Sequence, residues 1–400
     1  GVLEENITNA IINASKRVID GEFDDEFVVD IFQTGSGTST NMNANEVISN
    51  IAIESLNGKI GSRSPIHPND HVNKGQSSND VIPTAIHVAA AVAIKNDLIP
   101  SLEKLQNSLK RKSKEFWNVV KTGRTHLQDA TPIRLGQEFL GYEGQINNGI
   151  IRATKAIEEL SILALGGTAV GTGIGMHPQF AKKVISNLKA ETNINFSETE
   201  NHFQSQSTID NCVSASGEIK TIAVSLMKIA NDIRWLGSGP RAGIGEISLP
   251  EVQPGSSIMP GKVNPVIAES VTMVCAQVIG NDATISIAGQ SGNFELNVMM
   301  PVAAHNLLES IDLLAKVSEN FSVQCIDGLK STDTGPKMVM NGLAICTALA
   351  PIIGYDKAAK IAHEASETGE SIKETSLRLT DLSESELDDI LEPLGMTEPK

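Results

Sequence analysis

Long amphipathic and apolar segments dominate the sequence from about Ser77 onwards. Apolar side chains recur every three or four residues, which predicts helices over about 79–109, 136–163, 208–236, 266–288 and 301–329. Each is much longer than the mean helix of globular proteins, about 11–12 residues. Pro100 predicts a kink in the first.

Several of these helices are apolar around most of their circumference. The segments 222–230 and 266–276 carry almost no charged side chains. Such a helix must be surrounded by other helices. Five helices cannot all be surrounded within one chain, so we expect an oligomeric helical core. A monomeric bundle is the alternative.

The remaining segments differ from the long helices in composition and periodicity. Residues 1–75 are mixed, and the helical pattern of Leu3–Val18 suggests that a segment before Gly1 is missing. Gly237–Pro265 holds six Gly and, before Pro265, four Pro, which predicts a long loop. Loops of this length are unusual unless they are functional. Strands are hard to find anywhere.

The length allows two to three domains, and the composition changes near Ser77 and again after about Ser331, in a chain that is mostly α-helical by its pattern. The expected boundaries are 1–76 for an N-terminal domain, 77–333 for the long-helix bundle and 334–400 for a small C-terminal domain. Within the last, short helices are expected near 336–350, 357–367 and 383–391.

Composition excludes several classes of function. The net charge of −16 and the 14 aromatic residues in 400 disfavour nucleic-acid binding. No CxxC or CxH pair is formed by the four cysteines, which are Cys212, Cys275, Cys325 and Cys346. This spacing disfavours a disulfide scaffold, a zinc site and an iron–sulfur cluster. It favours a protein of the reducing cytosol. The longest apolar stretch, near Ile86–Ile94, is too short to span a membrane, and no signal peptide is visible.

Two polar segments precede helices in the first quarter of the chain. Gly35–Glu46 combines glycine, hydroxyl and amide residues before a helix expected near Asn43. Ser77, Ser78 and Asn79 stand at the start of the first long helix and follow the segment His67–His71. Exposed N–H groups and the positive end of a helix dipole favour anions at such places. Ordinary helix capping is the alternative, and a metal on His67 and His71 lacks an obvious third ligand.

Two further polar segments carry ionisable groups. His126 stands beside Arg124 and Thr125 in a polar turn and suits a general acid or base, although a structural histidine is the alternative. Gly255–Pro265 places Lys262 and Asn264 at the start of a helix. A loop that brings a hydroxyl and a cation to a site can act as a lid.

Glu269 follows on the first turns of that helix, where a carboxylate could orient a histidine. Together the four segments suit a small polyanionic substrate. In so acidic a chain, Lys262, Lys74, Arg124 and the helix ends must supply the positive potential.

The segment Gly255–Pro265, read as GSSIMPGKVNP, resembles the signature GSSxMPxKxNP of the fumarase/aspartase superfamily. The other three segments match the superfamily in order, over essentially the whole chain. Gly261, His126 and the stretch Gly167–Gly173 resemble class II fumarase, since aspartases usually have Ala and Gln at the first two positions. The resemblance implies a three-domain subunit with five long helices, and a homotetramer with a twenty-helix core. Each active site would be built by three subunits.

The implied reaction is the reversible anti hydration of fumarate to (S)-malate in the tricarboxylic acid cycle. It proceeds through an aci-carboxylate, without a metal or organic cofactor, in the cytoplasm or, in a eukaryote, the mitochondrial matrix. The resemblance makes Ser256 the base and puts Lys262 and Asn264 on the carboxylate where charge develops. His126, paired with Glu269, handles the departing hydroxide through a water.

Substrate binding is implied for Ser36, Gly37, Thr38, Ser77, Ser78, Asn79, Thr125, Ser257, Lys262, Val263 and Asn264. A second anion site is implied for His67, Pro68, Asn69 and Asp70, although Ser64 stands where the family often has Arg. An aspartate ammonia-lyase remains an alternative, as does a non-catalytic structural member such as a lens crystallin. No nucleic-acid or membrane partner is expected.

Overall fold

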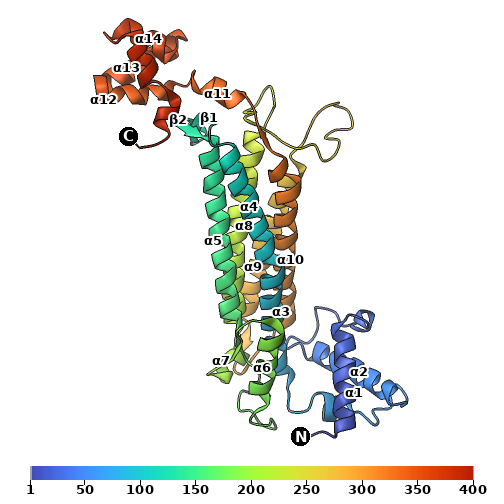
Figure 1. Ribbon diagram of the computed structural model, residues 1–400. Coiled ribbons are helices and arrows are strands. Elements are labelled where there is room, and N and C mark those ends of the chain that lie inside the picture. The colour runs from blue at the N-terminus through green and yellow to red at the C-terminus, as the bar shows by residue number, and fades with distance from the viewer. Residues whose placement is uncertain (1, 400) are drawn as a thin grey trace. The chain divides into compact units, whose positions relative to one another are not determined.

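The computed structural model, drawn in Figure 1, describes residues 2–399. These residues form two compact units. The first comprises residues up to Pro100, Ile151–Ala223 and Cys275–Ala315. The second comprises Ser101–Ile150, Val224–Val274 and the residues from Lys316 onwards. The expected mostly α-helical fold is confirmed, whereas the three domain boundaries expected from the sequence stay a prediction.

The five predicted long helices are present, with ends close to the expected ones. The first runs as α3 (Ser78–Ala93), a π-helical turn η3 (Ile94–Leu98) and α4 (Ile99–Glu115). The predicted irregularity therefore takes the form of a wide turn before Pro100, because proline has no N–H and its ring crowds the carbonyl four residues earlier. The other four are α5 (Leu135–Leu160), α8 (Asp210–Leu236), α9 (Val266–Gly289) and α10 (Met300–Gln324).

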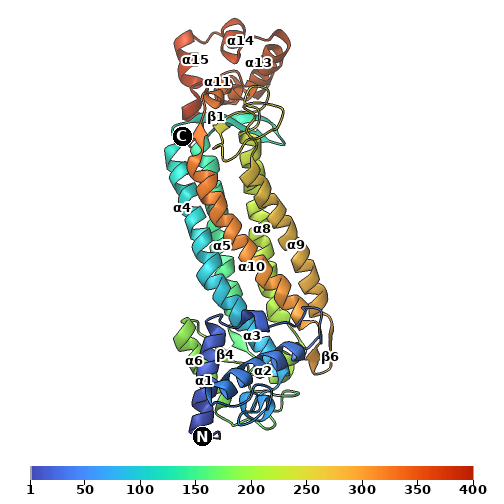
Figure 2. The same cartoon turned by 90° about the vertical axis from the view of Figure 1, so that its right-hand side faces the viewer.

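The first unit begins with α1 (Glu5–Ile19) and α2 (Thr38–Ser55), which pack side by side in Figure 2. Their core contains Ala10, Ala14, Ile51, Ala52, Ile53 and Ile66. The expected helix start near Asn43 was wrong, since α2 begins at Thr38. Gly37 has a left-handed φ of 74° before it, and a Cβ there would lie 2.9 Å from Cγ2 of Ile82. Glycine therefore allows this close start.

Short elements complete the first unit. They are η2 (Pro68–Val72), β3 (Ile162–Leu163) paired in parallel with β4 (Ser197–Glu198), α6 (Phe180–Thr192), α7 (His202–Ser207) and the hairpin of β6 (Gly292–Asn293) with β7 (Leu296–Asn297).

The second unit contains an antiparallel hairpin that the sequence did not predict. Strand β1 (Val120–Thr125) pairs with β2 (Gln128–Arg134), with Thr125 opposite Gln128. The two residues between them, His126 and Leu127, have φ of 58° and 60°. Two-residue turns of this kind usually carry Asn-Gly or Gly-Gly, so His-Leu gives no hairpin signal. A further pair joins β5 (Ile247–Ser248) to β8 (Lys330–Ser331).

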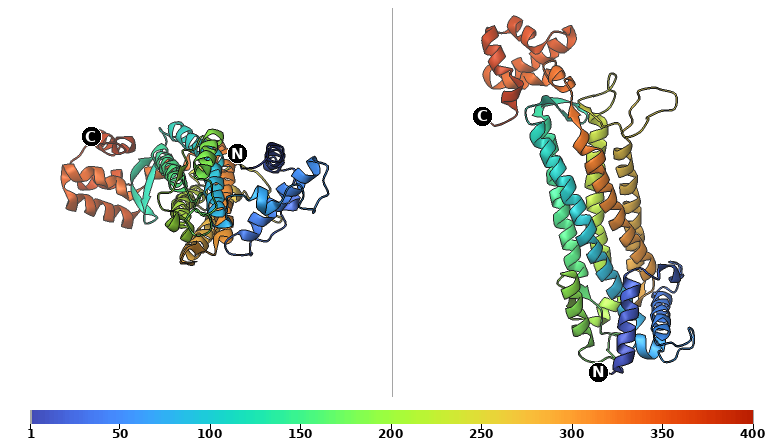
Figure 3. Two further views of the ribbon diagram at one scale, coloured as in Figure 1. Left: turned by 90° about the horizontal axis from the view of Figure 1, so that it is seen from below. Right: turned by 45° about the vertical axis from the view of Figure 1, so that its right-hand side comes forward.

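The C-terminal helices have a hydrophobic core of their own. It includes Ile345, Leu349, Ile361 and Leu387, contributed by η5 (Leu343–Leu349), α13 (Tyr355–Thr368) and α15 (Glu384–Ile390). Figure 3 shows these helices gathered in one group. The group also contains α14 (Ile372–Leu379), which was not predicted although Ser371 and Glu374 form a capping box. Short helices link the remaining elements. They are η1 (Asp24–Glu26), η4 (Ile326–Gly328), α11 (Thr334–Val339), α12 (Ala350–Ile353) and η6 (Pro393–Met396).

Two helical stretches, Ser78–Glu115 and Val266–Gly289, are long and apolar enough to cross a membrane by length and composition alone. The sequence argument considered only the stretch near Ile86–Ile94, whereas the helical run that contains it extends from Ser78 to Glu115. Core helices of water-soluble proteins meet the same two criteria. Here Ile94, Leu98 and Val271 are buried inside the protein.

Candidate active site

The structure brings together two of the four polar segments, both in the first unit. The side-chain oxygen of Thr38 is 2.7 Å from that of Ser36 and 2.7 Å from that of Ser78. Thr38 is the first residue of α2, Ser78 is the first of α3, and Ser77 caps α3. A chain of hydroxyls therefore links two helix N-termini, whose free N–H groups and dipoles attract anions.

The buried carboxylate of Asp80 fixes this arrangement. Its Oδ1 accepts from the Ser77 N–H at 3.0 Å, and its Oδ2 accepts from the N–H groups of Gly166 and Thr168 at 3.0 and 3.1 Å. Asn79 Nδ2 donates to the carbonyl of Ala169 at 2.8 Å. The loop that follows Leu165 is thus attached to the start of α3. Our sequence analysis missed Asp80, although Ser77 and Asp80 have the spacing of a capping box.

The proposed second anion site surrounds the π-helical turn η2. His67 caps this turn, and its Nδ1 accepts from the N–H groups of Asn69 and Asp70 at 3.2 and 3.3 Å. The Asp70 carboxylate lies 3.5 Å from the same nitrogen. Asn69 and Asp70 are exposed, and Pro68 is buried. Since Nδ1 of His67 is occupied, only its Nε2 can meet a ligand.

The third segment forms the tip of the β1–β2 hairpin in the second unit, where Thr125 and His126 are exposed. Arg124, just before them, donates from Nη2 to Glu246 Oε1 at 2.8 Å. Its charge is therefore balanced by Glu246, and the expectation that it supplies free positive potential loses support. Among the described residues, His126 and Glu269 form no hydrogen bond or ion pair with each other within the chain.

A buried ionic cluster supports the base of this hairpin. Lys121 is 1% exposed, and its Nζ lies 2.7 Å from Glu138 Oε1 and 3.0 Å from Glu246 Oε2. Burial raises the pKa of Glu138, and the ammonium of Lys121 opposes that rise. Glu246 immediately precedes β5, so the cluster connects β1, α5 and the long glycine-rich loop.

In the fourth segment, Gly255–Pro265, two backbone N–H groups donate hydrogen bonds to Ser256, the predicted base. Ser256 Oγ accepts from the N–H groups of Ile258 and Met259 at 3.2 and 3.1 Å. The turn is closed by Asn264, whose Nδ2 donates to the Gly255 carbonyl at 2.6 Å. A Cβ at Gly255 would lie 1.8 Å from the Lys262 carbonyl oxygen, so only glycine fits. This arrangement stabilises negative charge on Ser256 Oγ.

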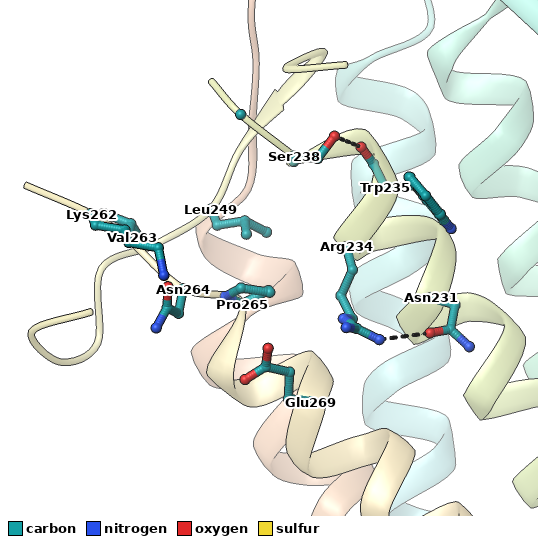
Figure 4. A pocket seen from close by; sticks show the side chains of 12 residues that line it. Asn231, Arg234, Trp235, Ser238, Leu249, Lys262, Val263, Asn264, Pro265 and Glu269 are labelled. Carbon is teal, nitrogen blue, oxygen red and sulfur yellow. Dashed lines mark hydrogen bonds between the residues drawn. The ribbon is translucent and has the colours of Figure 1, made fainter. Parts of the chain in front are cut away.

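A cavity of about 500 Å³ opens beside this segment (Figure 4). Lys262, Val263, Asn264, Pro265 and Glu269 line one side of it. The other side is lined by residues of α8 and of the loop after it, none of which our sequence analysis had named as site residues. They are Asn231, Arg234, Trp235, Gly237, Ser238, Gly239 and Leu249. Arg234 lies near the end of α8, and only the fold shows which wall of the cavity it faces.

Metal ligands are not grouped in the described part of the chain. Between residues 2 and 399 no cluster of three or more His, Cys, Asp or Glu side chains has the geometry to hold a metal ion.

Comparison with known proteins gives matches over the whole chain. The family described as "Lyase" matches residues 1–280, and the family described as "Fumarase C C-terminus" matches residues 345–398. The chain is 50% identical to "Fumarate hydratase class II 2" of Bradyrhizobium diazoefficiens over 400 residues, which are 100% of this chain and 85% of the relative.

Two further matches are equally extensive. The chain is 51% identical to "Fumarate hydratase, mitochondrial" of Saccharomyces cerevisiae over 401 residues, 100% of this chain and 82% of the relative. The structure is similar to the crystal structure of recombinant class II fumarase from Schistosoma mansoni, with a TM-score of 0.97 and 40% identity over 100% of this chain and 87% of the other.

Proposed function

The chain belongs to the class II fumarate hydratase family, and we propose that it catalyses the reversible hydration of fumarate to (S)-malate with the division of roles given below. The enzyme is a carbon–oxygen lyase. The observation that carries the assignment of roles is the pair of backbone N–H groups on Ser256 Oγ.

Ser256 acts as the base. In the dehydration direction its alkoxide takes the C3 proton of malate, and the electron pair of the broken C–H bond moves into the adjacent carboxylate. A serine alkoxide is too basic to persist unless donors stabilise it. The N–H groups of Ile258 and Met259 are fixed donors that need no reorganisation during the reaction.

Lys262 and Asn264 hold the carboxylate on which charge develops as the aci-carboxylate forms. Lys262 is exposed and lines the cavity, so its ammonium is available to an anion. The side-chain amide of Asn264 donates one N–H to the Gly255 carbonyl, and its second N–H is available to the substrate. Val263 and Ser257 add contacts on either side of the turn.

His126 protonates the departing hydroxide through a water, and Glu269 supports its positive charge. Ser36, Gly37, Thr38, Ser77, Ser78 and Asn79 bind the substrate carboxylates, with Thr125 assisting. The hydroxyl chain from Ser36 to Ser78 and the two helix N-termini support this role. His67, Pro68, Asn69 and Asp70 form a second anion site, whose available donor is Nε2 of His67.

These groups meet in a homotetramer whose active sites are shared between subunits. The support is the exposed apolar surface of the long helices: Val224 on α8 is 53% exposed, and Met273 and Ile287 on α9 are 66% and 56% exposed. A second copy of the chain would cover such side chains. Sedimentation analysis tests this, since a monomer at micromolar concentration would contradict it. The compartment that we propose is the cytoplasm, or the mitochondrial matrix for a eukaryotic source.

The decisive assay follows fumarate absorbance in chelator-treated buffer, with and without ammonium. We expect turnover that does not depend on ammonium and that falls at least 100-fold in Ser256→Ala. Glu251→Gln, an exposed change in the same loop, is the matched control and should retain activity. Turnover only with ammonium would make the enzyme an aspartate ammonia-lyase. An active Ser256→Ala would refute the assigned base.

A further inference from the structure

Arg234 lines the cavity of the second unit and forms no ion pair with any residue between 2 and 399. It stands near the end of α8, and its Nη1 donates to Asn231 Oδ1 at 2.9 Å. Its Nε is buried and has no hydrogen-bond partner. Among the described residues no carboxylate pairs with it. By contrast, Arg111 and Arg124 are paired with acids.

The opposite wall of the cavity carries the lid groups. Figure 4 shows Arg234 and Asn231 on one side, and Lys262, Asn264 and Glu269 on the other. The two cations and the single carboxylate leave the cavity with one excess positive charge. A bound carboxylate would balance it.

The chemistry of the guanidinium specifies the kind of ligand. Arginine presents a planar fork of N–H donors that matches a carboxylate with two parallel hydrogen bonds. Nη1 of Arg234 uses one N–H on Asn231, which leaves its second N–H and both N–H groups of Nη2 for an acceptor in the cavity. A volume of about 500 Å³ suits a small molecule.

We propose that Arg234 is a further carboxylate-binding residue of this cavity, holding with Lys262 the same carboxylate of the substrate. This inference rests on the proposed function, because it names an additional contact to the same dicarboxylate. Arg234 binds the substrate in the ground state and remains bound as charge develops on that carboxylate.

The test compares Arg234→Gln with Arg241→Gln, an exposed arginine of the following loop that does not line the cavity. The readouts are the KM for fumarate and the inhibition constant for succinate, a non-reacting four-carbon dicarboxylate. Loss of charged hydrogen bonds predicts an increase of about 10- to 100-fold in both for Arg234→Gln, and less than twofold for Arg241→Gln. Arg234→Lys, which keeps the charge and loses the fork, should give an intermediate value.

Equal succinate constants for Arg234→Gln and Arg241→Gln would overturn the inference. A lower kcat with an unchanged succinate constant would also overturn it, because Arg234 would then act on Glu269 and not on the substrate. If the Gln variant does not fold, the succinate constant of Arg234→Lys decides: an unchanged constant refutes the role.

Calorimetric binding of succinate separates this inference from the proposed function. If the wild-type protein does not turn over fumarate, the proposed function is contradicted. The difference in succinate affinity between wild type and Arg234→Gln would still test whether Arg234 binds a carboxylate.

Discussion

Replacing Lys121 by Met tests whether the buried ionic cluster stabilises the second unit. Methionine has nearly the same length but no charge. It removes the contacts of Nζ with Glu138 at 2.7 Å, Glu246 at 3.0 Å and the carbonyl of Thr122 at 3.0 Å. Arg124 still pairs with Glu246, so Glu138 is the group left without a cation.

The magnitude follows from burial. Removing one partner of a buried ion pair costs about 3–5 kcal/mol, because the remaining charge stays out of water. The exposed pair of Lys104 with Glu319 has the same separation, 2.7 Å, but its side chains are 46% and 57% exposed. Exposed pairs contribute about 0–1 kcal/mol. Lys104→Met is therefore the matched control.

The assay is thermal unfolding at a fixed protein concentration, followed by circular dichroism. At about 2–4 °C per kcal/mol for a cooperative unit of roughly 200 residues, Lys121→Met should lower the midpoint by about 6–20 °C. Lys104→Met should lower it by no more than about 4 °C. Equal shifts in the two variants would refute the argument that burial makes the cluster important.

The effect should also depend on pH. Burial raises the pKa of Glu138, and removing Lys121 raises it further. A raised carboxyl pKa in the folded state destabilises the fold above that pKa, and the loss shrinks as pH falls toward the value in the unfolded chain. The difference between Lys121→Met and wild type should therefore be smaller at about pH 5.5 than at about pH 8.

Three further predictions concern other parts of the chain. Asp80→Asn replaces one carboxylate oxygen by an NH2 group, so either the Ser77 N–H or the N–H groups of Gly166 and Thr168 lose their acceptor; urea unfolding should show a loss of about 2–4 kcal/mol, and the KM for fumarate should rise. Burial lowers the pKa of His87, so wild type should lose more thermal stability below about pH 6.5 than His87→Gln, and equal losses would contradict a neutral buried ring. Burial raises the pKa of Cys212 and Cys325 to about 12, so a thiol reagent should label the half-buried Cys346 first, as mass spectrometry of the native protein would detect.

Periodicity predicted the long helices because their packing repeats along the sequence. The helices α5, α8 and α9 begin and end within a few residues of expectation. The β1–β2 hairpin was missed, since its turn is made by His126 and Leu127 rather than by glycine or asparagine. Local chemistry could not indicate that such a turn would form there.

The candidate site shows the same limit. Hydroxyls and amides before helices identified Ser36, Thr38 and Ser78, and the structure joins them through hydrogen bonds. Arg234 was missed because an arginine near the end of a long helix that carries other charged residues has no local signature. Its placement across the cavity from Lys262 depends on how α8 packs against the loop, which is a long-range property of the fold.

The turn around Ser256 has a consequence for how this enzyme can evolve. The donors to its Oγ belong to the main chain of residues 258 and 259, so every amino acid except proline can supply them. The Ile258 side chain is 83% exposed and contributes nothing to those bonds. Drift at these two positions is therefore nearly neutral for the chemistry, whereas Gly255 has no tolerated replacement. Natural selection acts here on the path of the backbone, and an alignment that scores side chains alone would underestimate how tightly that path is constrained.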